Sequence, residues 1–180
     1  MQKLSLNMKI MIGSSLLLLI ACLLALFTLD GLSRGKPINW LHNAAGYQQA
    51  VYRAQQNGKP LLILLDSADC ARCHQLEQQL WQDPALHSGL NDWQLVRLQR
   101  DADAATAQLV SHYQGSAELP LVILERSPQG ATQPLYFNRP LSQFSLATDP
   151  NLAAQPLETP RLLKVLAQWL QAHQSPTQEP

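Results

Sequence analysis

The chain has 180 residues, which is enough for one domain and an additional segment but too short for two ordinary domains. Hydrophobic residues make up 46% of it and charged residues 14%, a balance that allows a buried core and argues against disorder through the middle of the chain. The formal net charge is +0 and no run of Lys or Arg occurs, which disfavours a nucleic-acid-binding surface.

The N-terminal segment contains an uncharged apolar run over residues 10–29. As a helix rising about 1.5 Å per residue, this run is long enough to cross a bilayer core of about 30 Å. We therefore predict a cytoplasmic N-terminus over 1–9, a single-pass transmembrane signal anchor over 10–29 and a linker over 30–43. The amino group, Lys3 and Lys9 precede the run, whereas Arg34 and Lys36 follow it together with Asp30. This slight charge bias leads us to expect the soluble domain in the periplasm, on a bacterial inner membrane.

Three other interpretations of this segment stay open. The first is a cleaved signal peptide, although no A-x-A-like site follows the run. The second is a lipoprotein, because the stretch from Leu19 to Cys22 resembles a lipobox, although the apolar run continues past Cys22 to Leu29. The third is a domain that faces the cytoplasm.

The rest of the chain alternates helical and strand patterns. A continuous apolar run over 61–65 is typical of a strand buried on both faces, and Asp83-Pro84 is typical of a helix start. We predict helices at 44–57, 70–81, from Pro84, at 102–113 and at 160–172, and strands at 61–65, 93–98, 121–124 and 134–138.

The order of these elements predicts an α/β fold with a central mixed sheet flanked by helices. Helices between successive buried strands favour parallel pairing, and the turn at 127–130 favours an antiparallel hairpin at the end of the sheet. We place the domain at 44–172. Residues 140–159, with three prolines and no clear period, are expected to be an irregular insertion, and 173–180 a disordered tail.

Two of the three cysteines, Cys70 and Cys73, lie three positions apart, directly after a predicted buried strand and at the start of a predicted helix. Unpaired N–H groups and the helix dipole stabilise a thiolate at that position. A pair at this spacing can also close a disulfide. We predict that Cys70 is the nucleophile and Cys73 the resolving thiol.

The order of strand, loop, CxxC and helix, followed by Leu119-Pro120 before a strand, resembles the thioredoxin superfamily. With the Asp-Pro helix start it is most similar to the group that includes the C-terminal domain of the disulfide reductase DsbD, over residues 44–139. The resemblance implies a thioredoxin-like fold and thiol–disulfide exchange with protein substrates, with reduction as the expected direction. It also implies that Leu119 and a cis-Pro120 line the substrate groove, and that a membrane electron donor of DsbD type is a partner.

Some residues depart from the family pattern. Asp69 stands where thioredoxin has Trp, and Leu64 stands where it has a buried acid. Arg72 should favour a Cys70 thiolate and Asp69 should oppose it, and His74 is a third candidate tuning residue. These effects have opposite signs, so neither the redox potential nor the direction of electron flow follows from the sequence, and the protein substrate is not identified either.

Three alternatives to this chemistry remain. Cys70-Ala71-Arg72-Cys73-His74 also fits the c-type haem attachment pattern, with His74 as proximal ligand, although every Met lies at or before residue 11. A zinc site would need two further ligands from histidines without ligand spacing. A thioredoxin fold kept only as a binding module is the third alternative. We expect no cofactor and no metal.

A few other side chains have simpler expected roles. Asp66 is either a proton-transfer group near the cysteines or a solvated residue at the end of a strand. We expect Asp101 and Asp103 to cap the following helix and Glu125 to lie at the exposed end of a strand. Core or interface positions are expected for Trp40, Trp81, Trp93 and Trp169.

Overall fold

A seven-stranded mixed sheet organises the computed structural model, which describes residues 37–126, 130–148 and 154–174. Its strands lie in the order β1-β3-β2-β4-β5-β6-β7. They are β1 Leu41–His42, β2 Leu61–Asp66, β3 Gln94–Gln99, β4 Leu121–Glu125, β5 Thr132–Phe137, β6 Gln143–Leu146 and β7 Gln155–Pro156. The helices are α2 Asn43–Asn57, α3 Ala71–Leu76, the π-helix η1 Glu77–Trp81, α4 Pro84–Gly89, α5 Ala104–Gln114 and α6 Thr159–Gln174.

The centre of the sheet is β2, every residue of which is buried. It pairs in parallel with β3, which in turn pairs in parallel with β1. On its other side β2 pairs antiparallel with β4, and the pairings from β4 through β7 are all antiparallel. The predicted mixed sheet and the predicted β4–β5 hairpin are therefore confirmed.

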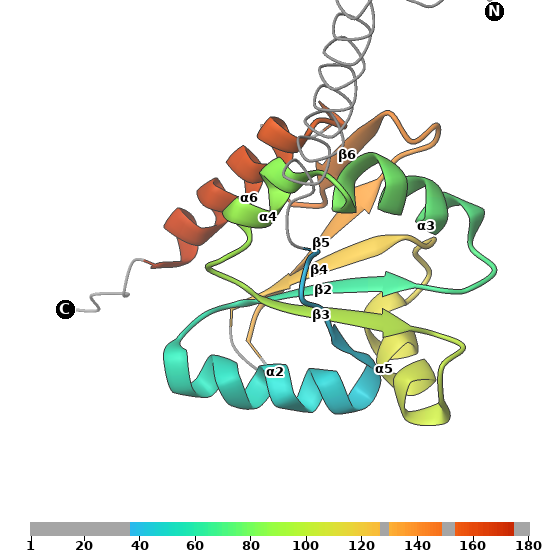
Figure 1. The fold of residues 1–180 in the computed structure, drawn as a ribbon, viewed down its shortest axis with the longest axis vertical. Helices are drawn as coiled ribbons and strands as arrows, with labels where there is room; N and C mark the ends of the chain where they lie inside the picture. Colours follow the sequence, from blue (N-terminus) through green and yellow to red (C-terminus); the bar gives the residue numbers. More distant parts are fainter. Residues whose placement is uncertain (1–36, 127–129, 149–153, 175–180) are drawn as a thin grey trace, which may run out of the picture. The chain divides into compact units, whose positions relative to one another are not determined.

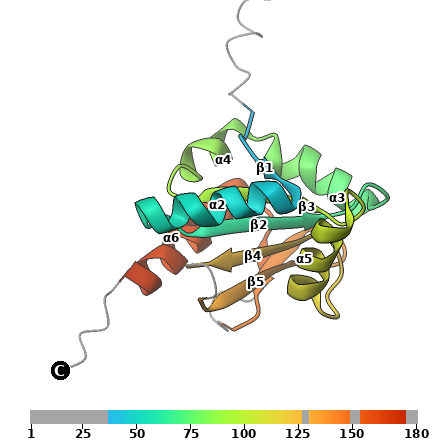
Figure 2. The ribbon, with the colours of Figure 1, turned by 90° about the horizontal axis from the view of Figure 1, so that it is seen from below.

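The two faces of the sheet bury separate cores, because side chains alternate between the faces along each strand. On one face, Leu62 and Leu64 of β2 pack in a cluster with residues of α3, η1, α4 and α6. On the other face, Leu61, Ile63 and Leu65 pack with residues of α2 and α5. Figure 1 shows α2 and α5 on one side of the strands and α3, α4 and α6 on the other, and Figure 2 shows the α2–α5 side. All four tryptophans are buried, as predicted.

The helix boundaries follow from local signals. Gly58 ends α2 with a left-handed φ of 70°, which glycine adopts without strain. The Asp83 side chain accepts a hydrogen bond from the Ala85 N–H and so caps α4, as predicted. The helix predicted over 70–81 begins at Ala71 with Cys70 as its N-cap, and its last five residues are π-helical.

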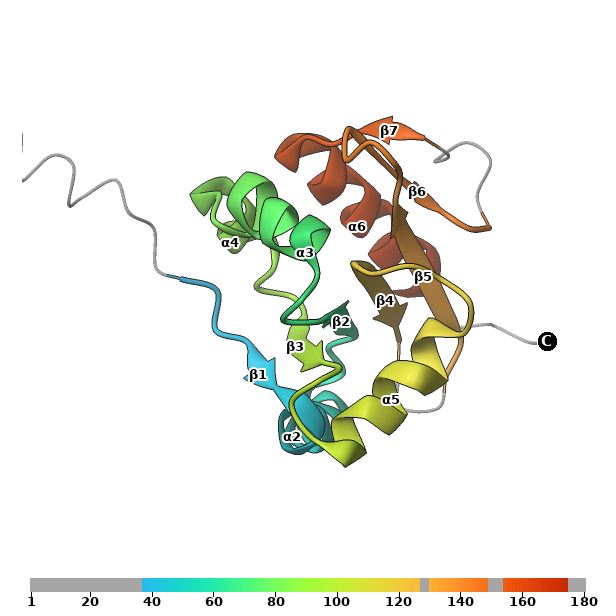
Figure 3. The ribbon, with the colours of Figure 1, turned by 90° about the vertical axis from the view of Figure 1, so that its right-hand side faces the viewer.

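Residues 140–159 were expected to form an irregular insertion. This prediction is wrong for the described part of that segment. Residues 143–146 form β6, in which Phe144 and Leu146 are buried, and 155–156 form β7. Figure 3 shows both strands continuing the sheet beyond β5, next to α6. These strands are too short, and too close to prolines, for a period to be visible in the sequence.

Both ends of the predicted domain also need correction. Residues 37–43, expected to belong to a linker, contain β1 and the start of α2, and Trp40 is only 9% exposed. At the other end α6 continues to Gln174. Glu125 was expected at an exposed strand end but is 1% exposed, because α5 covers it and the Tyr113 hydroxyl donates to its Oε2 at 2.9 Å.

The predicted transmembrane anchor at 10–29 lies outside the described residues. Among the helices that are described, none combines the length and the hydropathy that a membrane crossing requires.

Candidate functional site

The cysteine pair lies where β2 passes into α3, at the carboxyl end of the central strand. Cys70 and Cys73 form a disulfide. Cys70 is the N-cap of α3: its sulfur accepts from the Cys73 N–H at 3.1 Å, and its carbonyl accepts from the Cys73 and His74 N–H groups. The sulfur of Cys70 thus lies beside the Cys73 N–H at the start of the helix, where this donor and the helix dipole stabilise a thiolate after reduction.

The two cysteines differ in solvent access. Cys70 is partly exposed, whereas Cys73 is only 5% exposed and lies on the inner side of α3. A substrate disulfide can therefore approach Cys70 more readily than Cys73. This difference fits a nucleophile at Cys70 and a resolving thiol at Cys73.

The loop before Cys70 is held by residues from a different part of the chain. The Ala68 N–H donates to both carboxylate oxygens of Asp101, at 3.1 and 3.0 Å, and this bond lowers the pKa of Asp101. The Ala68 carbonyl pairs with Nε2 of His74 at 3.0 Å. Asp101 was expected to cap α5, but only Asp103 does so, because Asp101 reaches across to the cysteine loop instead.

The other two candidate tuning residues contact different parts of the chain. Asp69 is 80% exposed, accepts a hydrogen bond from the Ser67 hydroxyl, and lies 3.8 Å from Arg100. The partners of Arg72 among the described residues are oxygen atoms of the segments 118–119 and 137–138. Its guanidinium therefore links the CxxC turn to these two segments through their oxygen atoms.

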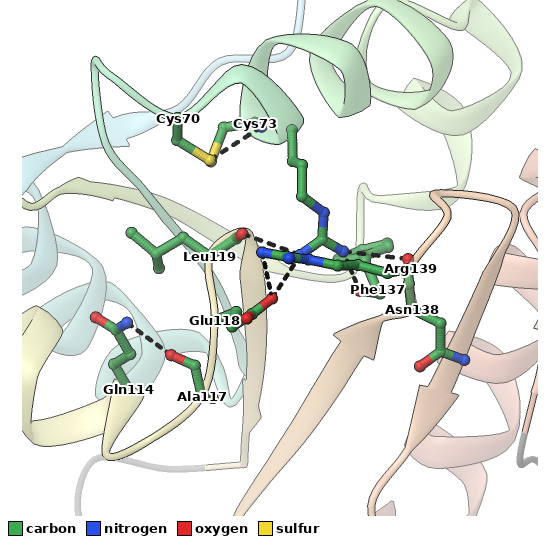
Figure 4. A network of polar contacts seen from close by, with 10 residues as sticks. Cys70, Cys73, Gln114, Ala117, Glu118, Leu119, Phe137, Asn138 and Arg139 are labelled. Carbon is green, nitrogen blue, oxygen red and sulfur yellow. Dashed lines mark hydrogen bonds and ion pairs between the residues drawn. A yellow bond between two sulfur atoms is a disulfide. The ribbon is translucent and has the colours of Figure 1, made fainter.

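Arg72 joins the CxxC turn to the segment before β4, which contains the predicted groove residues. The Leu119–Pro120 peptide bond is cis, as the resemblance implied. Arg72 Nη1 donates to the Leu119 carbonyl at 3.5 Å, and Pro120 is buried beside the partly buried Leu119. Figure 4 shows Leu119 on the segment that faces the disulfide. The structure thus brings Cys70, Cys73, Arg72, Leu119 and Pro120 into one site.

On β5 the same guanidinium has further partners that sequence reasoning missed. Arg72 Nη2 donates to the Phe137 carbonyl at 2.6 Å and to the Asn138 carbonyl at 3.1 Å. These acceptors are main-chain atoms 65 and 66 residues away, so no side-chain pattern in the sequence could indicate them. Glu118 and Arg139, which lie beside this network, were also missed (Figure 4).

A buried acidic group lies at the end of β2, four positions before Cys70. Asp66 is 3% exposed, and Oδ2 accepts from Nε and Nη2 of Arg97, both at 2.6 Å. Arg97 also donates to Glu77 of η1 at 2.8 Å. Burial raises the pKa of Asp66, and the attraction of Arg97 only partly offsets that rise.

Asp66 belongs to the sheet face that α3 covers, because it alternates with Leu62 and Leu64, which pack against Leu76. Of the two roles expected for Asp66, a solvated strand end is therefore wrong. The partner Arg97 was missed, although its place among the apolar residues of β3 was a signal. In a strand of this kind, a charged residue on the buried face needs an opposite charge.

A comparison with protein families agrees with this geometry. Residues 40–125 match a family model described as thioredoxin-like. Curated protein sequences give no match to the chain.

Solved structures with a similar fold include a thioredoxin from Thermus thermophilus, 18% identical over 74% of this chain and 88% of that one, with a TM-score of 0.47. The oxidised C-terminal domain of DsbD from Neisseria meningitidis is 14% identical over 72% of this chain and 97% of that one, with a TM-score of 0.49. An oxidoreductase named DsbH is 14% identical over 59% of this chain and 77% of that one, with a TM-score of 0.47.

Proposed function

Since residues 40–125 belong to the thioredoxin-like superfamily, we propose that the chain is a thiol–disulfide oxidoreductase that reduces disulfides in protein substrates through Cys70 and Cys73. The observation that carries this proposal is the disulfide at the start of α3, with one partly exposed and one buried cysteine. The cis peptide at Leu119–Pro120 beside it supplies a wall for a substrate chain.

The reaction starts from the reduced pair. The Cys70 thiolate attacks one sulfur of the substrate disulfide, so that a mixed disulfide forms and the other substrate sulfur leaves as a thiolate. The Cys73 thiol then loses its proton and attacks the sulfur of Cys70. The mixed disulfide breaks, the second substrate thiolate leaves, and the Cys70–Cys73 disulfide forms. Two electrons pass from the protein to the substrate, and the two substrate thiolates take up protons.

Asp66 is the candidate acceptor for the Cys73 proton. Its pKa is raised by burial, so it holds a proton more readily than an exposed carboxylate does. It lies on the sheet face that α3 covers, and the buried Cys73 is a residue of α3 itself. Arg97 orients the carboxylate from the neighbouring strand, and Glu77 of η1 in turn accepts a hydrogen bond from Arg97. In this proposal Asp66 receives the proton when Cys73 attacks and returns it when the pair is reduced again.

The direct test is catalysis of disulfide reduction by the full chain, purified in a mild detergent, with a dithiol as electron source. We expect Cys70→Ser to abolish turnover and Cys73→Ser to accumulate mixed disulfides, visible on non-reducing gels. Cys22→Ser, which changes the one cysteine outside the pair, is the matched control and should retain turnover. Full activity in the Cys70→Ser protein would refute the mechanism. A haem-sized mass adduct on Cys70 and Cys73 would point instead to c-type haem attachment.

The proposed location is the periplasmic side of a bacterial inner membrane, with residues 10–29 as the anchor. The anchor rests on the apolar run, and the orientation rests on the charges that flank it. In that location a membrane donor of DsbD type would return the pair to its reduced form, since the periplasm is kept oxidising. Full-length protein should stay in the membrane fraction after alkaline washing, and Cys22→Ser should not release it. A reporter fused after Pro180 that is active only in the cytoplasm would contradict the proposed orientation.

A further inference from the structure

Two guanidinium groups share one carboxylate beside the disulfide. Nη1 of Arg72 lies 3.2 Å from Oε2 of Glu118, and Nη2 of Arg139 lies 2.8 Å from the same oxygen. Figure 4 shows Glu118 on the segment before β4 and Arg139 after the end of β5. We call Arg72 and Arg139 the guanidinium pair. With Glu118 included, one positive charge is in excess.

The three groups differ in how firmly they are held. The Arg72 side chain is 21% exposed, and main-chain carbonyls of Leu119, Phe137 and Asn138 fix its guanidinium. In contrast, Glu118 is 61% and Arg139 67% exposed. Exposed ion pairs in water are weak, so the Glu118 carboxylate can move away from the guanidinium pair at little energetic cost.

This arrangement lies on the path of a substrate chain. A substrate whose sulfur reaches Cys70 and whose backbone runs along Leu119 passes beside Arg72, because Arg72 contacts the Leu119 carbonyl. Next to Cys70 in the sequence, Asp69 has its own partner: Oδ1 of Asp69 and Nη2 of Arg100 lie 3.8 Å apart, and the two charges balance. The excess charge at the site is therefore on the Leu119 side.

We propose that the guanidinium pair selects substrate disulfides that have an acidic side chain next to the reacting cysteine. The substrate carboxylate takes the position of Glu118 between the two guanidinium groups, where planar N–H donors suit a carboxylate. Glu118 occupies this position when no substrate is bound. The proposal rests on the proposed function and adds the substrate class to it.

The test uses three peptides with the same intramolecular disulfide and with Asp, Asn or Lys beside one cysteine. The full chain in detergent reduces each peptide, with a dithiol as electron source, and kcat/KM is compared. We expect about a fivefold preference for the Asp over the Asn peptide at low salt, which falls in high salt because exposed charges are screened. The Lys peptide should be the poorest substrate.

Variants separate charge selection from a general loss of structure, because they move the preference in opposite directions. Arg139→Gln should bring the Asp/Asn ratio close to 1. Glu118→Gln frees the guanidinium pair from its internal partner and should raise the ratio above that of the unchanged protein. Arg161→Gln removes an arginine of similar exposure, 50%, on α6 and should keep the ratio unchanged.

Calorimetry with a Cys70→Ser/Cys73→Ser chain measures its affinity for the same peptides in their dithiol form. Because this chain cannot exchange disulfides, the affinities report charge selection in binding alone. Affinities that decrease in the order Asp, Asn, Lys support the charge selection even if no peptide is reduced. In that case only the proposed function fails. Equal affinities and equal kcat/KM values for the three peptides would overturn the charge selection and leave the proposed function intact.

Discussion

Replacing the buried Asp66 by Asn tests whether this carboxylate favours or opposes folding. Two effects compete at neutral pH. The ion pair with Arg97 favours the charged form, and removing one partner of a buried pair typically costs about 3–5 kcal/mol. Burial at 3% exposure opposes the charged form. Since the net effect is a raised pKa, burial outweighs the attraction of Arg97.

The sign of the pH dependence follows from the raised pKa. Below the ordinary value of 3.8, Asp66 is protonated in both the folded and the unfolded chain, and its contribution to stability is fully present. As the pH rises from there through the raised pKa, the unfolded chain releases this proton more readily, so the free energy of unfolding falls by up to about 1.4 kcal/mol per pH unit. Asn cannot ionise, so Asp66→Asn removes this decrease.

We therefore expect Asp66→Asn to match the unchanged protein in stability near pH 4 and to exceed it at pH 7. Arg97 is not left alone in the variant, because it keeps Glu77 at 2.8 Å and is 25% exposed. Urea unfolding of the oxidised chain, followed by Trp fluorescence, measures the difference across this pH range, and all four tryptophans report on the folded domain. The same variant should accumulate mixed disulfide during turnover, because the proton of Cys73 then lacks its acceptor.

Two results would refute this reasoning. If Asp66→Asn were several kcal/mol less stable than the unchanged protein at pH 7, the attraction of Arg97 would outweigh burial. If both proteins lost stability equally as the pH rose, another group would be responsible for the decrease. Asp83, Asp101 and Asp103 cannot be that group, because hydrogen bonds lower their pKa and their contribution is lost only on acidification.

Three further substitutions test the supports of the fold and the site, each by urea unfolding or by turnover. Asp83→Ala removes the cap of α4 and the acceptor of the Thr159 hydroxyl, so we expect a loss of about 2 kcal/mol, and no loss would contradict both contacts. Gly46→Ala places a methyl group 2.6 Å from the Leu41 carbonyl carbon, so we expect destabilisation by about 1–3 kcal/mol despite the better helix propensity of Ala, and a more stable variant would show that β1 can shift. Asp101→Ala frees the loop before Cys70, so we expect slower turnover with little change in stability, and unchanged turnover would mean that the loop needs no support.

The central part of the fold could be predicted because its signals are local. The apolar run of β2, the Asp83-Pro84 step and the CxxC turn each identify an element from a few neighbouring residues. β6 could not be found this way, since it has only four residues and becomes a strand by pairing with β5. Its Phe144 is opposite Phe137, a partner that only the folded sheet supplies.

The candidate site divides in the same way. The cysteines and the cis proline are recognisable from residue type and order, so they could be named in advance. The partners of Arg72 could not, because its acceptors are main-chain carbonyls, which every residue has. Asp66 was identified as a candidate, but its burial and its pairing with Arg97 depend on how β2 and β3 align, with Leu64 opposite Arg97.

Both edges of the sheet end in strands of only two residues, β1 at one side and β7, which contains Pro156, at the other. An edge this short offers few free backbone groups to another chain, and proline removes a donor altogether. An unfolded substrate, rich in exposed backbone, therefore finds little opportunity to add itself to the sheet as an eighth strand. If the chain reduces protein disulfides as proposed, its short sheet edges disfavour aggregation with any unfolded substrate that it meets.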